Sequence, residues 1–243
     1  MQNRDSLTIK VSTILVALIL AMMPYASVTM PSLEASSEEM RASPPGVGTT
    51  NLTVLNTTYL SGNQSYDDLY IGCGITSPCG SIISNGDLIL TVNTLTVASG
   101  GSIIAYESQS NSQGVGTSVT LSSSHRGDGA GGAGHYGSGG SGGAASGNGG
   151  SSYGGGNESG STGGTVYDSS SNLVSVGGTG GGKIVIYADV IEIYGTVDAS
   201  GQDGEEGYRY QNGSGNGGSG AGGGSGGSIV MRANEVTIGS SSG

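Results

Sequence analysis

The sequence contains no tryptophan and no phenylalanine, and its 12 tyrosines are its only aromatic residues. A core built around large aromatic side chains is therefore excluded. Proline is also scarce, with 5 residues against 51 glycines, and the glycines keep no strict Gly-X-Y register, which excludes a collagen-like triple helix. Lys and Arg total only 7 against 18 Asp and Glu. The net charge of −11 argues against a nucleic-acid partner, because phosphate binding needs a basic surface.

Most of the regularly spaced apolar residues fall in three copies that align without gaps, Gly86–Ser99, Gly182–Gly195 and Gly227–Ser240. Apolar residues at every second position are typical of half-buried strands, and the Asn or Asp between two such alternations favours a bend. A repeated strand–bend–strand unit indicates a solenoid with a narrow, continuous core. The predicted core residues are Leu88, Leu90, Leu95, Val97, Ile184, Ile186, Ile191, Ile193, Val197, Ile229, Met231, Val236 and Ile238.

A third strand is expected after each of the first two copies, at Ser102–Ala105 and at Thr196–Ala199. Three short strands joined by tight bends make one coil of a parallel β-helix, and parallel connections are right-handed as a rule. We therefore predict an all-β fold, a right-handed parallel β-helix (solenoid) with long Gly/Ser-rich insertions.

The sequence divides into five regions: a signal peptide or signal anchor (1–33), an acidic linker with two prolines (34–50), N-terminal β-helix rungs with one disulfide (51–125), a Gly/Ser-rich insertion (126–178), and C-terminal rungs (179–243) with a second Gly-rich loop (202–226). The leader has a basic start and an apolar run that is short for a membrane span. Either cleavage or anchoring predicts export, to the extracellular space or the cell surface. The third copy stops after its second strand, which favours truncation over an end that stacks on another subunit.

The Gly/Ser-rich insertion admits two interpretations. Glycine recurs at every third position from Gly131 to Gly143 and again from Gly217 to Gly226, a spacing that lets polyproline-II-like chains pack closely. The spacing breaks after Gly143, and long loops without regular structure are often disordered. We therefore expect a loosely packed or disordered insertion.

Cys73 and Cys79 are close in sequence within an exported chain, so a disulfide between them is expected. Asn-x-Ser/Thr sequons, which are candidates for N-glycosylation, occur at Asn51, Asn56, Asn63, Asn157 and Asn212.

The other short motifs carry weaker signals. The integrin-type tripeptide Arg126-Gly127-Asp128 is expected by chance in so glycine-rich a tract. His125 and His135 could join Asp128 as ligands of a transition metal, but free histidines in a solvated loop are the expectation, with no metal site and no cofactor.

Carboxylates are the residues to consider for glycan cleavage. The densest set contains Asp189, Glu192, Asp198, Asp203, Glu205 and Glu206. Alignment of the copies argues against an active site there: Asp189 falls where the other copies have Asn93 and Asn234, which makes it a bend residue. Glu192 falls on threonines at an outward-facing position. No catalytic residue is assigned.

The sequence of Thr179–Gly243 and Asn85–Ala105 resembles the rungs of glycine-rich parallel β-helix (adhesin-like) surface proteins of prokaryotes. That resemblance implies a non-enzymatic secreted or cell-surface protein, such as an adhesin, envelope or filament component. The alternative is a carbohydrate-active β-helix enzyme or a glycan-binding module. Expected partners are glycans, other surface proteins, or a second copy through the uncapped end, with membrane contact only through an uncleaved leader.

Overall fold

The computed structural model describes residues 50–75, 78–106, 112–121, 129–142, 147–154, 157–207 and 220–239. The chain divides into two units, Met1–Arg41 and Ala42–Gly243, and all described residues belong to the second. The expected leader and nearly all of the acidic linker therefore lie outside the described residues. Within the described ranges there are strands and no helix, which confirms the all-β class. Accordingly, those ranges hold no helix of the length and apolarity needed to cross a membrane.

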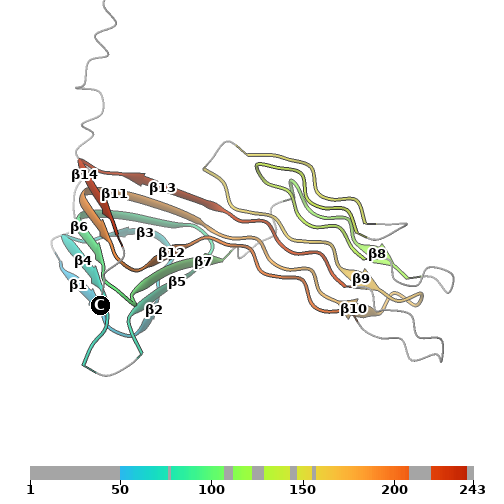
Figure 1. The fold of residues 1–243 in the computed structure, drawn as a ribbon, viewed down its shortest axis with the longest axis horizontal. Coiled ribbons are helices and arrows are strands. Elements are labelled where there is room, and N and C mark those ends of the chain that lie inside the picture. The colour runs from blue at the N-terminus through green and yellow to red at the C-terminus, as the bar shows by residue number, and fades with distance from the viewer. Residues whose placement is uncertain are drawn as a thin grey trace, which may run out of the picture. The chain divides into compact units, whose positions relative to one another are not determined.

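Two open sheets of parallel strands form the part that we call the strand body (Figure 1). The larger sheet contains β1 (Leu52–Val54), β3 (Gly62–Ser65), β4 (Asp68–Ile71), β6 (Leu88–Val97), β11 (Lys183–Ile193), β13 (Ser228–Arg232) and β14 (Glu235–Ile238). The smaller sheet contains β2 (Thr57–Tyr59), β5 (Ser81–Asn85), β7 (Ser102–Tyr106) and β12 (Thr196–Asp198). From β4 to β7 and from β11 to β13 the chain alternates between the two sheets.

The three sequence copies lie side by side in the larger sheet, in the register of the gapless alignment. Leu88 of β6 pairs with Ile184 of β11, and Ile184 pairs in turn with Ile229 of β13. The third strand of each rung pairs similarly, with Thr196 of β12 opposite Ser102 of β7. The parallel stacking predicted from the repeats is therefore confirmed, although long stretches of chain separate the copies.

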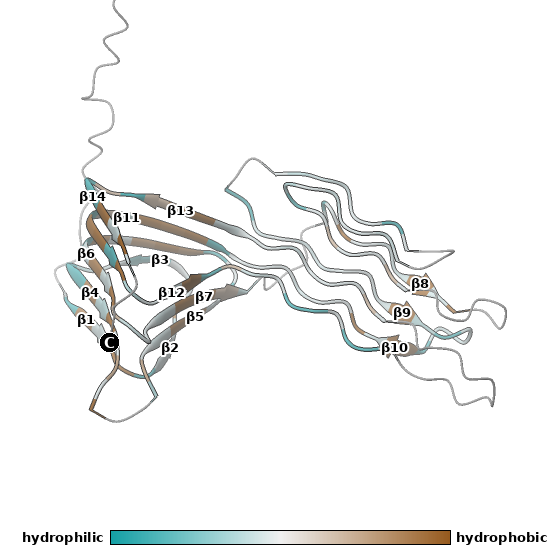
Figure 2. Ribbon diagram, in the orientation of Figure 1, coloured by the Kyte–Doolittle hydropathy of each residue, from teal (hydrophilic) through white to brown (hydrophobic). Residues whose placement is uncertain are grey.

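The core of the strand body is a column of aliphatic side chains between the two sheets. The fully buried members with the largest side chains are Leu69, Ile71, Ile82, Leu88, Leu90, Leu95, Ile103, Ile184, Ile186, Ile191, Val92 and Val97. Hydropathy colouring shows the same concentration of apolar residues in these strands (Figure 2).

The third copy departs from the predicted core. Ile229, Val236 and Ile238 are 42%, 47% and 70% exposed, and Met231 is only partly buried. The reason is their position, because among the described strands β13 and β14 pair only with β11 and are covered from one side. Val197 is likewise only partly buried, in β12 at the edge of the smaller sheet.

The bends also differ from expectation in one respect. β6 and β11 each continue as a single strand through the bend, whereas the sequence predicts two strands. The pairing between β6 and β11 omits Asn93 and Asp189. Asn234 donates its side-chain amide to Asp189 Oδ1 at 3.1 Å, and Asn93 donates to Asp67 one rung away. Stacked Asn and Asp side chains thus link the bends of neighbouring rungs, which agrees with the interpretation of Asp189 as a bend residue.

Candidate functional site: the glycine-rich bundle

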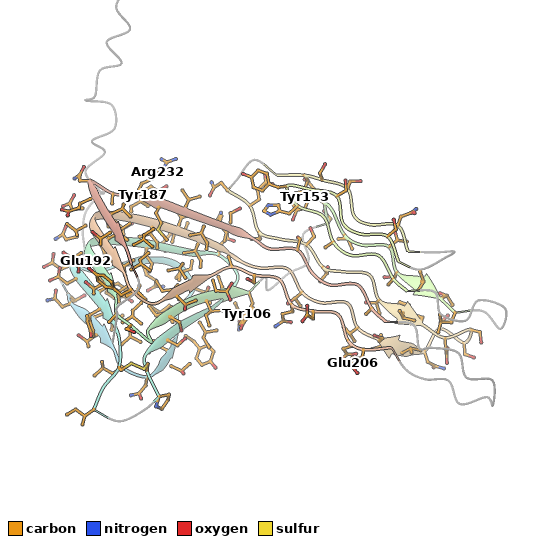
Figure 3. All side chains as sticks on the ribbon, viewed as in Figure 1. Tyr106, Tyr153, Tyr187, Glu192, Glu206 and Arg232 are labelled. Atoms are coloured by element: carbon orange, nitrogen blue, oxygen red, sulfur yellow. A yellow bond between two sulfur atoms is a disulfide. The ribbon has the colours of Figure 1, made fainter. Side chains whose placement is uncertain are left out.

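The remaining described residues form an array of extended segments, which we call the glycine bundle (Figure 1). Its segments are residues 112–121, 129–136, 137–142, 147–154, 157–167, 173–182, 199–207 and 220–227. Side chains are sparse along these segments and dense over the strand body (Figure 3). Apolar burial therefore contributes little to holding the bundle together, and other interactions must do so.

Between any two neighbouring segments, backbone hydrogen bonds recur at every third residue. Gly160 and Gly163 donate to the carbonyls of Gly181 and Gly178, at 2.8 and 2.9 Å. Gly178 in turn donates to Gly222 at 2.9 Å. A repeat of three residues is that of the polyproline-II helix, which has three residues per turn and no internal hydrogen bonds. Each segment must therefore satisfy its backbone groups on its neighbours.

An inner segment shows all three faces of such a helix in use. Every amide from Ala130 to His135 donates to a backbone carbonyl of an adjacent segment. The acceptors belong in rotation to segments 220–227, 112–121 and 137–142. Segment 199–207 uses fewer donors: Gln202 and Glu205 donate to Thr179 and Val176. The bundle is thus a hydrogen-bonded lattice of backbones.

Close approach of the segments explains the glycines. A Cβ at Gly163 would lie 1.9 Å from Gly222 O, and one at Gly222 would lie 2.0 Å from Gly131 O. No side chain fits at such distances, so only glycine allows the packing. The expectation of a loose or disordered insertion is therefore wrong for the described residues, and the interpretation based on the three-residue spacing is the better one.

The boundary of the bundle differs from the sequence-based division. Strands of the first half of the body end with β7 at Tyr106, and residues 112–121 already belong to the bundle rather than to a rung. Residues 179–182 belong to it as well, and the expected second loop (202–226) supplies two of its segments where it is described. Two separate stretches of sequence thus build one bundle.

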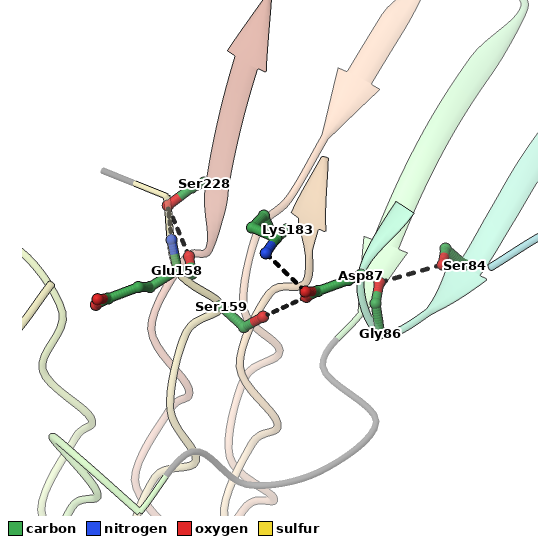
Figure 4. Close-up of polar contacts among 7 residues, drawn as sticks. All are labelled: Ser84, Gly86, Asp87, Glu158, Ser159, Lys183 and Ser228. Carbon is green, nitrogen blue, oxygen red and sulfur yellow. Dashed lines mark hydrogen bonds and ion pairs between the residues drawn. The ribbon is translucent and has the colours of Figure 1, made fainter. Parts of the chain in front are cut away.

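Polar contacts join the bundle to the strand body (Figure 4). Asp87 forms an ion pair with Lys183 at 2.8 Å and accepts a hydrogen bond from Ser159 at 2.9 Å. The buried hydroxyl of Ser228 accepts from the Glu158 amide at 3.1 Å and donates to the Glu158 carbonyl at 2.6 Å. Segment 157–167 is thereby fixed to Asp87, directly before β6, and to Ser228 at the start of β13, while the ion pair joins Asp87 to Lys183 at the start of β11. We call this set of contacts the joint.

A small sheet lies at the opposite end of the bundle. It contains β8 (Val119–Thr120), β9 (Val166–Tyr167) and β10 (Leu173–Ser175), with β9 and β10 antiparallel. Val119 and Val166 are buried there with Ala130, in a second, small apolar cluster. This cluster holds the ends of three segments together.

The connection between β9 and β10 is a turn held by Asp168. Its Oδ1 accepts from the amides of Ser170 and Asn172, and its Oδ2 accepts from the Asn172 side chain, all at 2.8 Å. The Asn172 side-chain hydrogen bond, followed by the backbone hydrogen bond from the same residue, holds the pKa of Asp168 below its ordinary value. Leu173 next to the turn is 59% exposed, and Val176 is 42% exposed. The turn therefore presents polar and apolar groups on an ordered backbone.

The acidic residues considered for catalysis have separate local partners. Glu192 accepts from Thr96 Oγ1 at 3.2 Å, Asp198 from the Ser200 amide at 2.8 Å, and Glu205 from the Val176 amide at 2.9 Å. Asp189 belongs to the ladder of bend residues described above. These contacts satisfy backbone and side-chain donors and do not build a shared site; Asp203 and Glu206 lie beside Glu205 on segment 199–207.

The remaining sequence motifs have mixed outcomes. Cys73 and Cys79 form the expected disulfide. The sequon residues Asn51, Asn56, Asn63 and Asn157 are exposed. Asn212, His125 and the Arg126-Gly127-Asp128 tripeptide lie outside the described residues.

His135 is not the solvent-facing loop histidine that the sequence predicts. It is only 7% exposed and lies on an inner segment of the bundle. Its position follows from the three-residue repeat, since neighbouring segments cover it. In the part of the chain that the structure describes, no three His, Cys, Asp or Glu side chains are grouped so as to hold a metal ion.

Comparison with known proteins gives no relative: no family model, no curated protein and no solved structure matches the chain.

Proposed function

We propose that this chain is a non-enzymatic, exported surface protein of adhesive type. The strand body is its scaffold, built as a right-handed parallel β-helix, and the glycine bundle is a rigid arm that presents the β9–β10 turn to a partner. The observation that carries the proposal is the three-residue lattice of backbone hydrogen bonds in the bundle.

Rigidity is the property that this lattice adds. Ordering a residue's backbone costs about 1–2 kcal/mol, and glycine loses the most conformational freedom of all residues. A disordered Gly/Ser tract would already serve as a flexible spacer at no such cost. An ordered array of glycines instead holds its end at a fixed position relative to the sheets, which is useful where that end must meet another surface.

The bundle and the turn differ in which residues they can accommodate, and this difference supports the same proposal. Many positions inside the bundle, such as Gly163 and Gly222, must be glycine, because a Cβ there would collide with neighbouring carbonyls. The turn at Asp168–Asn172 carries no such restriction and displays Leu173 beside polar groups. We infer that binding specificity lies at this end, with glycans or surface proteins as partners. The disulfide and the acidic surface support export.

The test replaces residues 168–172 with Asn-Gly, a two-residue connection that suits an antiparallel hairpin. We expect the variant to keep the circular dichroism spectrum of the parent and to lose most of its binding to intact cells and to a glycan array. A matched change at the other end of the bundle, Ser138→Ala on an exposed residue, should leave binding unchanged. Unchanged binding by the turn variant would refute the role of this end.

A further inference from the structure

The larger sheet has an uncovered edge at β13 and β14 (Figure 1). In the described part of the chain both strands pair only with β11, so the backbone groups on their other side have no strand to bond. Ile229, Val236 and Ile238 are exposed along this edge, although each pairs with a buried isoleucine of β11. An edge that combines unpaired backbone groups with apolar side chains is suited to pair with another strand.

Hydrogen bonds at the end of β14 show which residues direct their backbone groups to this edge. The amides and carbonyls of successive residues in a strand point to opposite sides of it. The Gly239 amide, directly after β14, donates to Ile193 O of β11 at 3.0 Å. By alternation, Val236 and Ile238 direct their backbone groups away from β11, to the free edge.

The same reasoning applies to β13, starting from β6. Thr91 O accepts a hydrogen bond from the Tyr66 amide, at the end of β3, so the backbone groups of Leu90 face β11 instead. Leu90 pairs with Ile186, whose backbone groups therefore face β13. Its partner Met231 then directs its own groups to the free edge, as does the residue two positions earlier in β13.

We propose that this edge binds the same edge of a second copy of the chain. A two-fold axis passes through the bend between the two strands, so that β13 of each copy runs antiparallel to β14 of the other. In the register centred on the bend, Ile229 lies opposite Ile238 of the second copy. Nearer the bend, Met231 lies opposite Val236. All four side chains are on the core side of the sheet, and the free backbone groups of each pair face each other, as a hydrogen-bonded antiparallel pair requires.

The same register brings opposite charges together on the outer face of the sheet. Arg232, at the end of β13, lies opposite Glu235 at the start of β14 of the second copy, and the symmetry repeats this pair. These two exposed residues are the only charged residues of the two strands. The Arg232 guanidinium lies 5.8 Å from the ring centroid of Tyr187, which holds it on this face. Opposite charges on facing strands are favourable and like charges are not, so charge and apolar matching select one register.

The pairing ends at the start of β13, where Ser228 is bonded to Glu158 in the joint (Figure 4). The other end of the stack matches this edge less well. There β3 places Gly62 and Gln64 in line with the buried leucines of β6, so a head-to-tail stack would set a glycine and a polar side chain against the apolar edge. A two-fold contact also closes with two copies, whereas a head-to-tail contact continues into a filament.

Sedimentation velocity of the full chain, from about 1 to 100 µM, tests the proposal. We expect a monomer–dimer equilibrium. Arg232→Glu and Glu235→Arg should each weaken the dimer at least about tenfold, because each variant sets two pairs of like charges against each other. An equimolar mixture of the two variants should form a heterodimer as stable as the parent dimer. One variant is then acidic at both positions and the other is basic at both, so every facing pair is attractive.

Substitutions of exposed isoleucines provide the matched control. Ile238→Lys should weaken the dimer, because lysine on an edge strand opposes pairing, whereas Ile75→Lys, on a loop away from this edge, should dimerise as the parent does. All four positions are exposed, so each variant should keep the parent circular dichroism spectrum. A monomer at every concentration would overturn the proposal, as would a dimer that the charge variants do not weaken or a mixture that does not associate. Growth beyond two copies would overturn it in favour of head-to-tail stacking.

Discussion

At the scale of single residues, the glycines of the bundle are not equivalent. Gly163→Ala would place a Cβ 1.9 Å from a backbone carbonyl oxygen, whereas Gly140 has nothing within 4 Å of the corresponding point. We expect Gly163→Ala to lower the free energy of unfolding by about 1–3 kcal/mol or more, through overpacking. Gly140→Ala should be neutral or stabilising by up to about 1 kcal/mol, because it restricts the unfolded chain. Urea denaturation of both variants measures the difference, and equal effects would contradict the close packing.

Asp168 gives a prediction of pH dependence at the same scale. Its folded pKa is lowered, so the folded turn binds the proton more weakly than the unfolded chain. The contribution of Asp168 to the turn is therefore complete above its unfolded pKa, about 3.9, and is lost as the pH falls through the lower folded value. Amide exchange at Asn172, followed by NMR between about pH 6 and 2, should show protection falling in that window. Ser169→Ala should keep this pH dependence and Asp168→Ala should abolish it; persistence in Asp168→Ala would refute the assignment.

At the scale of elements, the three-residue repeat predicts a pattern of amide exchange. In segment 199–207, Gln202 and Glu205 should exchange more slowly than Asp203 and Gly204, because the first two donate to segment 173–182. In segment 129–136 every amide from Ala130 to His135 should be protected. Residue-resolved NMR exchange measures both patterns. An alternation of period two in segment 199–207 would indicate strands and contradict the polyproline-II-like geometry.

The same scale shows what the sequence could predict. The strands and their register followed from the gapless copies, because a period of two fixes which side chains face the core. The exposure of Val236 and Ile238 did not follow from the sequence, because the pattern of one copy does not reveal whether a neighbouring strand lies on both of its sides. The ordered packing of the bundle could not be predicted for a related reason. Glycine segments pack closely only when a second stretch of sequence supplies their partners, and Gly222 lies far from its neighbour Gly131 in the sequence.

At the scale of the whole described unit, the strand body and the glycine bundle are stabilised by different interactions. The strand body is held by an aliphatic core whose buried members all lie outside residues 107–182. The bundle is held by backbone hydrogen bonds and by a much smaller apolar cluster. We therefore expect the strand body to fold without the bundle, whereas the bundle should depend on the strand body.

The structure supplies the connections for testing this independence. Tyr106 bridges Gly181, and the Gly227 amide donates to Ala199 O at 2.7 Å, so the bundle leaves and re-enters the body at two pairs of adjacent residues. We expect a chain in which short Gly-Asn-Gly turns replace 107–180 and 200–226 to fold, because the pairing of β6 with β11 and of β7 with β12 stays intact. Circular dichroism should show β structure and one cooperative thermal transition. A non-cooperative transition with exposed apolar surface, detected by dye binding, would show instead that the bundle is needed to hold the rungs in register.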